Sequence, residues 1–413
     1  MSITPRAVII TGATGYIGAR LVELAAGDGR AVTILTRNPA PTGVARAVGW
    51  VLGDALPADA LAPGIPAADH AVIHLAHDWR NTGDLNLAGT QALLASARDA
   101  GIGRFVFVSS QSAREDAANI YGRAKWRIEQ LLRAPGEVAA RVGLVYGGKM
   151  QAQYGLLSTL TKLAPVLPMI DPWREVQPIH LDEVCRGLLL LADGEQTGWV
   201  GLAGPVPVRF GTVLKTLARE LHGKSLPIIP VPLRLALLAC AVSAKIPVGP
   251  TVDRERVLGL AGTRTMPCAE HLADLGLEVQ PIEIGLRRER ASRRLLLAEG
   301  RTLLRYILGH EPGSALIRRY VRALDATGQS GPLPLSALSR RLPALVRFGE
   351  PIGAKSALGN RLALAASLVE ADPSGEHGFA GGSTGRRLAG LAGHIAMDAV
   401  AMPVRIVRQA LGR

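Results

Sequence analysis

Three side chains in the first third of the chain have types and spacing suited to proton transfer. Ser109 and Ser110 end an apolar run, Tyr121 follows eleven residues after Ser110, and Lys125 follows four residues later. Residues four apart share one face of a helix, so the phenol and the ammonium group can meet. A free tyrosine has a pKa of about 10, and a nearby lysine cation and an oxidised nicotinamide favour its phenolate. We therefore predict that Tyr121 acts as acid or base, that Lys125 lowers its pKa, and that Ser110 donates a hydrogen bond to a substrate oxygen.

A glycine-rich run near the N-terminus is suited to binding a dinucleotide. It lies between a predicted strand over Ala7–Thr11 and a predicted helix over Gly15–Ala26. Gly12 permits a tight turn, Gly15 lets the backbone approach a pyrophosphate, and Gly18 allows the helix to pack closely on the strand. The helix N-terminus adds N–H donors for the phosphates. The residues expected to bind the cofactor here are Gly12, Thr14, Gly15, Tyr16, Ile17 and Gly18, with Lys125 on the ribose hydroxyls.

The end of the next predicted strand, Ala31–Leu35, bears on the choice of cofactor. This strand end lies beside the adenosine ribose in a dinucleotide-binding fold, where an acidic residue binds the 2′-hydroxyl of NAD. Arg37 instead offers a cation for a 2′-phosphate, so we expect NADP as the cofactor. The alternative is that NAD binds and that Arg37 is a solvated surface residue. Asp54, just after a strand expected over Gly49–Leu52, is a candidate adenine contact.

The elements that must position these residues alternate between strand and helix. Such alternation predicts βαβ units and a parallel sheet. We therefore expect an α/β fold, a doubly wound Rossmann sheet, followed by a small substrate lobe that begins near residue 151. Further strands are expected over Ala71–Leu75 and Arg104–Ser109, and helices over Asn86–Ala100, Tyr121–Leu132, Leu181–Ala192 and Phe210–His222.

Composition limits the other classes of protein. Hydrophobic residues make up 48% and aromatic residues only 4% of the 413 residues, which suits aliphatic helices packed on a parallel sheet. Three cysteines, far apart in sequence, have no metal-ligand spacing, so no metal site is expected. A strand begins at Ala7, which leaves no room for a signal peptide, and the apolar run Leu233–Ile246 is shorter than the roughly 20 residues of a membrane span. We expect a cytoplasmic protein.

The motifs together resemble the extended or atypical short-chain dehydrogenase/reductases, the NAD-dependent epimerase/dehydratase family. The resemblance covers most of residues 5–285, in the family's order. It implies a Rossmann fold, a bound dinucleotide that Leu75 and Ala76 also contact, and the roles given above for Ser110, Tyr121 and Lys125. The matching segments are the three glycines, Asp54, His74–Ala76, Asn86–Thr90, Ser109–Ser110, Tyr121–Lys125, Arg141–Gly147 and Pro178–Val184. The segment Pro250–Leu286 is closest to the branch that resembles the complex I accessory subunit.

The sequence departs from sugar-nucleotide epimerases where a substrate would be held. The Ser110–Tyr121 spacing is short, and only Arg174 and Arg209 offer cations for a nucleotide diphosphate. His180, within the last matching segment, is expected to order a loop near the cofactor. The substrate class is therefore left as a secondary alcohol or ketone on a sugar-derived or lipid-like skeleton.

The last 128 residues carry most of the net charge of +13. Residues 1–285 hold 27 Lys and Arg against 25 Asp and Glu, whereas 286–413 hold 20 against 9. Helices are expected over about 288–308, 314–326, 353–371 and 384–411. We call residues 286–413 the arm. It could pack on the core or on another subunit, or it could bind peripherally to an anionic membrane through its last helix. Nucleic-acid binding is the least favoured alternative, because aromatic residues are scarce.

Two functions follow from these features. The first is an NAD(P)-dependent oxidoreductase, epimerase or dehydratase, with domains over 1–150 (Rossmann core), 151–285 (remaining Rossmann elements and lobe) and 286–413 (arm). The alternative is a non-catalytic dinucleotide-binding scaffold that joins a complex or membrane through its arm. The paired Tyr121 and Lys125 favour the first, because a scaffold has no need of them.

Overall fold

The structure is a computed structural model of the chain. It describes residues 6–37, 45–79, 83–234, 258–259, 262–326, 331–333, 335, 337–341, 343, 346 and 357–371. The chain forms two compact units, Met1–Glu289 and Arg290–Arg413.

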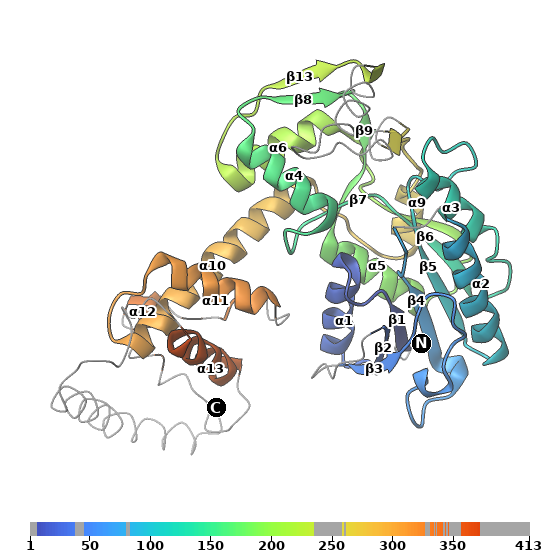
Figure 1. The fold of residues 1–413 in the computed structure, drawn as a ribbon, viewed down its shortest axis with the longest axis horizontal. Helices are drawn as coiled ribbons and strands as arrows, with labels where there is room; N and C mark the ends of the chain where they lie inside the picture. The colour runs from blue at the N-terminus through green and yellow to red at the C-terminus, as the bar shows by residue number, and fades with distance from the viewer. Residues whose placement is uncertain are drawn as a thin grey trace, which may run out of the picture. The chain divides into compact units, whose positions relative to one another are not determined.

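The first unit is built on seven parallel strands in the order β11-β6-β5-β4-β1-β2-β3 (Figure 1). The chain starts at β1, runs outward through β2 and β3, and returns on the other side of β1 as β4. The carboxyl ends of β1 and β4 therefore form a switch point, where ligands bind in folds of this kind. In the register, Thr11 lies beside His74 at that point. The strands are β1 (Ala7–Thr11), β2 (Val32–Thr36), β3 (Arg46–Gly49), β4 (His70–His74), β5 (Arg104–Ser110), β6 (Glu137–Val142) and β11 (Gly198–Leu202).

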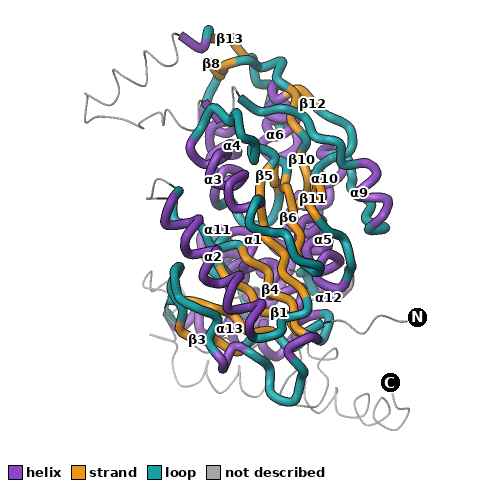
Figure 2. The backbone as a smooth tube through the Cα atoms, turned by 90° about the vertical axis from the view of Figure 1, so that its right-hand side faces the viewer, coloured by secondary structure: helices purple, strands orange, loops and turns teal. Residues whose placement is uncertain are grey.

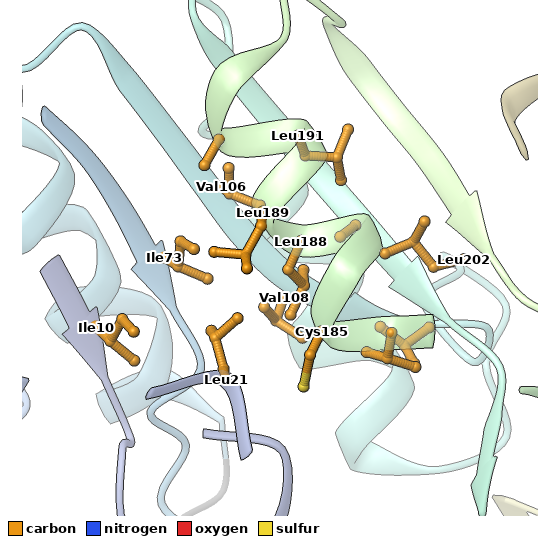
Figure 3. Packing of buried hydrophobic residues seen from close by; sticks show 14 of the residues in the cluster. Ile10, Leu21, Ile73, Val106, Val108, Cys185, Leu188, Leu189, Leu191 and Leu202 are labelled. Carbon is orange, nitrogen blue, oxygen red and sulfur yellow. The ribbon is translucent and has the colours of Figure 1, made fainter. Parts of the chain in front are cut away.

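Helices cover both faces of this sheet, which explains the nearly continuous apolar strands. On one face lie α1 (Tyr16–Gly27) and α5 (Leu181–Asp193), and on the other α2 (Asp84–Asp99) and α3 (Ile120–Glu129). Figure 3 shows the first of these two cores, where strand residues such as Ile73 and Val106 meet Leu21 of α1 and Leu189 of α5. The predicted doubly wound parallel Rossmann sheet is confirmed.

A lobe follows the sixth strand of the sequence and is seen at the top of Figures 1 and 2. Its core is formed by apolar residues of α4 and α6 together with the first turns of α10, where Ile282 and Leu286 are buried. Short strand pairs complete it. The elements are β7 (Leu144–Tyr146) with β10 (Pro178–His180), β9 (Glu175–Val176) with β12 (Val208–Arg209), β8 (Leu167–Ile170) with β13 (Ile228–Val231), and the helices α4 (Ala152–Leu163) and α6 (Phe210–His222). The short helix α9 (Ala269–Asp274) instead packs on the sheet next to β11.

The second unit has a core of its own. Leucines of α10 (Ile282–Leu308), α11 (Ser314–Ala326) and α13 (Ala357–Glu370) pack around Tyr320, and α12 (Ala337–Arg341) is a short further helix. A buried carboxylate stabilises this core. Glu299, which is 1% exposed, accepts a hydrogen bond of 2.7 Å from the Tyr320 hydroxyl and lies 3.4 Å from the Arg361 guanidinium. A buried charge is tolerated when it is paired in this way.

Most expected elements differ from the structure by one or two residues at their ends, but α3 ends three residues before the expected Leu132, and α10 begins six residues before the expected 288. The strand expected over Gly49–Leu52 is wrong, because pairing with β2 places β3 earlier, at Arg46–Gly49. The change in charge after residue 285 falls inside α10, and the two compact units divide after Glu289. The expected helix over 384–411 and most of the run Leu233–Ile246 lie outside the described residues.

Candidate active site

The glycine turn after β1 has the geometry that a pyrophosphate requires. Gly12 adopts a φ of +70°, and a Cβ at this position would come within 2.8 Å of the Ala76 nitrogen. A Cβ at Gly18 would clash with the Gly12 carbonyl. Gly15 is exposed at the N-cap of α1, where it leaves the helix N–H groups accessible. These residues fit a dinucleotide, because the backbone at Gly12 and Gly18 has room only for glycine and the turn leads into the N-terminus of a helix.

A buried hydrogen-bond chain fixes the switch point beneath this turn. The Thr11 hydroxyl accepts bonds of 3.1 Å from the backbone nitrogens of Leu75 and Ala76, so its proton is left for His74 Nδ1, 2.7 Å away. His74 Nε2 then donates to Thr90 Oγ1 at 3.0 Å. Burial, helped by the Lys125 charge, lowers the pKa of His74 to about 3. The imidazole is therefore neutral and positions the residues that follow β4.

Ser110, Tyr121 and Lys125 come together at the carboxyl end of β5. Ser110 ends this strand, and its hydroxyl lies close enough to Tyr121 to act on its phenol. Both Tyr121 and Lys125 lie on α3, whose N-cap Asn119 accepts a 3.0 Å bond from the Gly122 nitrogen. The Lys125 ammonium donates to the Val108 carbonyl at 2.7 Å and lies 5.8 Å from the centre of the Tyr121 ring.

The pKa of Tyr121 is shifted in the direction opposite to the one expected from the sequence. Burial raises it to about 12, and the nearby Ser110 hydroxyl only partly opposes this rise. Burial also lowers the pKa of Lys125 to about 7, against the attraction of Glu129. Lys125 is thus only partly charged at neutral pH, so it favours the phenolate less than a fully charged lysine would. Tyr121 is held as a protonated phenol.

Two ring side chains enclose Tyr121: His77, expected from the sequence to lie near the cofactor, and Trp79, which the sequence analysis missed. The Tyr121 ring stacks on the indole of Trp79, with centroids 4.9 Å apart and planes at 19°. The His77 ring lies edge-on to both, 4.8 Å from Trp79 and 5.1 Å from Tyr121. Burial and the nearby Lys125 lower the pKa of His77 to about 3, so this group is neutral. Trp79 remains 75% exposed, although it is a large apolar residue. The run of aromatic and histidine residues after β4 was the only signal for this cluster.

The residues expected near the adenosine end are exposed. Arg37 directly follows β2 at the carboxyl edge of the sheet, where its side chain is accessible. Asp54 is also exposed, and its carboxylate accepts a 2.9 Å bond from the Val51 nitrogen, which closes a turn.

The other candidate residues lie in or next to the lobe, where Arg174 and His180 form structural contacts. Arg174 pairs with Asp171 at 2.8 Å, so its charge is compensated, while Arg209 is exposed. His180 caps α5 by accepting a bond from the Asp182 nitrogen. No group of three or more metal-ligating side chains occurs in the part of the chain that the structure describes.

Comparison with known proteins agrees with this geometry. Residues 12–141 match a family model described as NAD(P)H-binding. A ceramide reductase of Caulobacter vibrioides (strain NA1000 / CB15N) is 32% identical over 211 residues, or 46% of this chain. The alignment covers 66% of that relative, so the chain spans just under two thirds of its length.

Two solved structures share the fold at low identity. A human epimerase family protein, solved with NADPH, is 19% identical with a TM-score of 0.54, and the match covers 69% of this chain and 99% of that one. The UDP-glucose 4-epimerase of Thermotoga maritima, solved with UDP-glucose, is 17% identical with a TM-score of 0.52, covering 70% and 98%.

Proposed function

We propose that this chain, which carries an NAD(P)H-binding domain of the short-chain dehydrogenase/reductase type, is an NAD(P)-dependent oxidoreductase that reduces a ketone to a secondary alcohol. The observation that carries the proposal is the meeting of Ser110, Tyr121 and Lys125 at the edge of the sheet where the glycine turn also lies. A bound dinucleotide would supply the hydride, and the chain's own residues would orient the ketone and supply the proton.

The direction of reaction is argued from the phenol. With its pKa raised to about 12, Tyr121 keeps its proton over the neutral range and can donate it to a carbonyl oxygen that gains negative charge. Ser110 would hold the same oxygen through its hydroxyl. The proton then passes from Tyr121 Oη to the new alcohol oxygen as the carbonyl carbon accepts the hydride, so charge and protons balance.

Lys125 would bind the cofactor and would also stabilise Tyr121 after it has lost its proton. Its ammonium now donates to the Val108 carbonyl, close to the ring that loses a proton. A phenolate formed at Tyr121 would attract a proton to Lys125, because opposite charges in a poorly solvated site stabilise each other. Ribose hydroxyls held by the same ammonium would fix the nicotinamide against the substrate.

NADP is the proposed cofactor because of Arg37. Its exposed guanidinium follows β2, beside the expected position of the adenosine ribose, and can form charge-assisted hydrogen bonds to a 2′-phosphate. NAD would lack this contact.

A lipid-like ketone is favoured over a sugar nucleotide as substrate. The exposed indole of Trp79 offers an apolar surface next to the reacting phenol, while Arg174 is already paired with Asp171. The name of the Caulobacter relative, a ceramide reductase, also supports a lipid.

The arm is proposed to be an appended module that meets an anionic membrane or a protein partner. Exposed arginines line its helices, among them Arg293 and Arg294 on α10 and Arg318 and Arg322 on α11. Within the described residues, no helix combines the length and apolarity needed to cross a bilayer.

The function is tested by identifying the cofactor released from the purified protein and then following its oxidation with a panel of ketones. The panel should include long-chain ketones and keto-sugar nucleotides, with product analysis. Reduction of a long-chain ketone is expected. An inert protein that copurifies with a partner would instead support the scaffold alternative.

A further inference from the structure

One face of α4 is apolar and points away from the lobe core. Its inward side is buried through Tyr154, Gly155, Ser158 and Thr161. On the other side, leucines recur at intervals of four and three residues, which places them in one stripe along the helix. Val166 follows directly after the helix. The exposed fractions are 41% for Leu156, 40% for Leu160, 72% for Leu163 and 39% for Val166. We refer to these four residues as the α4 stripe.

The segments that carry the α4 stripe and the strand pair beside it have only positive charges, and the acidic Glu220 of the neighbouring α6 is buried and paired with Arg219. The segments 147–170 and 223–234 contain Lys149, Lys162, Lys224 and Arg234 and no acidic residue. The Lys224 ammonium donates to the carbonyls of Lys162 and Ala164, both at 2.8 Å, and so binds the C-terminal end of α4 to the segment before β13. Cations near a helix C-terminus are favoured by its dipole.

The neighbouring strand pair adds apolar surface to the same lobe. Figures 1 and 2 show β8 and β13 beside α4 and α6 at one end of the first unit. Ile229 lies beside Pro168 in the register, and both side chains are exposed. Apolar residues that are clustered and framed by cations are unusual on a surface that faces only water.

We propose that the α4 stripe is a docking surface for an anionic membrane, in which α4 lies in the plane of the interface with its leucines among the acyl chains. An amphipathic helix with cations along its border binds a lipid surface in this way. The charges argue against a second copy of the chain as the occupant. A two-fold interface would bring Lys162 and Lys224 of both copies together, and like charges would oppose the contact.

The apolar sequence after β13 offers no acidic partner for the cations of this surface. The run from Leu233 to Ile246 contains Arg234 and Lys245 and no acidic residue, so it adds further positive charge. Anionic headgroups, by contrast, satisfy the cations while the acyl chains accept the leucines. Both parts of the surface then have a partner of matching chemistry.

The test compares the full chain with a variant that carries Leu160→Ser and Leu163→Ser, in flotation with vesicles of phosphatidylcholine and phosphatidylglycerol. Because burial of each leucine changes binding by about tenfold, the partition coefficient of the double variant should fall at least about tenfold. Val206→Ser is the matched control, since Val206 is also 72% exposed but lies between β11 and β12, outside α4. This control should bind as the unchanged chain does.

Two further measurements keep the proposal falsifiable. Vesicles of phosphatidylcholine alone should bind the unchanged chain much more weakly, and Lys162→Gln should weaken binding to anionic vesicles, because each change removes one charge partner of the headgroup contact. Equal flotation of the double variant and the control would overturn the proposal, whatever the arm contributes. A dimer in sedimentation that the double variant dissociates would also overturn it, and would assign the α4 stripe to contact between copies.

Discussion

The indole of Trp79 lies face to face with the phenol ring of Tyr121, 4.9 Å away and inclined by 19°. The catalytic candidate is thus covered on one side by a residue that is itself 75% exposed. Such an arrangement keeps the phenol poorly solvated, which agrees with its raised pKa. It also leaves an apolar surface where a substrate can lie against the site.

Replacing Trp79 with alanine should therefore weaken substrate binding more than the chemical step. Aromatic contacts contribute roughly 0.5–1.5 kcal/mol, so KM for an apolar ketone should rise about threefold to tenfold. Steady-state kinetics measures this change. Trp173→Ala, a loss of another exposed indole (59%), serves as the control and should leave KM unchanged. Identical kinetics in the two variants would remove Trp79 from the substrate site.

The buried Lys125 makes stability depend on pH above neutrality. Its pKa is about 7 in the fold, against 10.5 for the free side chain, so the unfolded chain binds more protons between these values. The free energy of unfolding should therefore rise from pH 7 to pH 9 through this residue, and the stabilisation is lost as pH falls through 7.

Denaturant unfolding at both pH values checks this prediction. In Lys125→Met the rise should be smaller than in the unchanged chain, whereas Lys215→Met, which alters an exposed lysine on α6, should preserve it. The same rise in both variants would show that Lys125 titrates normally.

Arg37 should discriminate between the two dinucleotides. Hydrogen bonds to charged groups contribute about 1.5–3 kcal/mol, so Arg37→Ala should weaken NADP binding about tenfold to a hundredfold and leave NAD binding nearly unchanged. Isothermal titration gives both dissociation constants. Arg209→Ala, another exposed arginine, is the control. Equal losses for NADP and NAD would contradict the assignment.

Truncation should remove the arm without unfolding the first unit, provided that the first turns of α10 are kept. Ile282 and Leu286 are buried in the lobe core, and the Glu289 carboxylate accepts a hydrogen bond from the Gly148 nitrogen. A chain that ends at Arg294 should therefore fold and bind cofactor. A chain that ends at Pro281 loses two buried aliphatic side chains, each worth about 2–5 kcal/mol, and should unfold or aggregate. Thermal unfolding of the two truncated chains tests this prediction. If the chain that ends at Arg294 also fails to fold, the stability of the first unit depends on the second.

The parts of the molecule that could be predicted from sequence are those set by local constraints. Gly12 and Gly18 occupy positions where a Cβ has no room, and such positions are visible as a motif. Fully apolar strands flanked by helices likewise identify the parallel sheet. The edge strand β3 was misplaced because four residues with only Val48 buried carry little pattern, and its position depends on pairing with β2.

Properties that depend on tertiary burial could not be predicted. Spacing alone places Lys125 near Tyr121, but it does not show that the residue is only 3% exposed and that its ammonium is bonded to Val108. The direction predicted from the sequence for the Tyr121 pKa shift was therefore wrong. Trp79 was missed for the same reason, since its stacking on α3 joins segments about forty residues apart.

The central claim, that Tyr121 donates the proton, is tested most directly by single-turnover oxidation of bound reduced cofactor in Tyr121→Phe, with a ketone that the unchanged chain reduces. General acid catalysis contributes roughly a hundredfold to ten-thousandfold, so the rate should fall by that factor while the cofactor dissociation constant changes less than about twofold. Ile120→Ala, which alters the exposed neighbour on α3, should retain the rate. A Tyr121→Phe variant that oxidises the cofactor as fast as the unchanged chain would contradict the account.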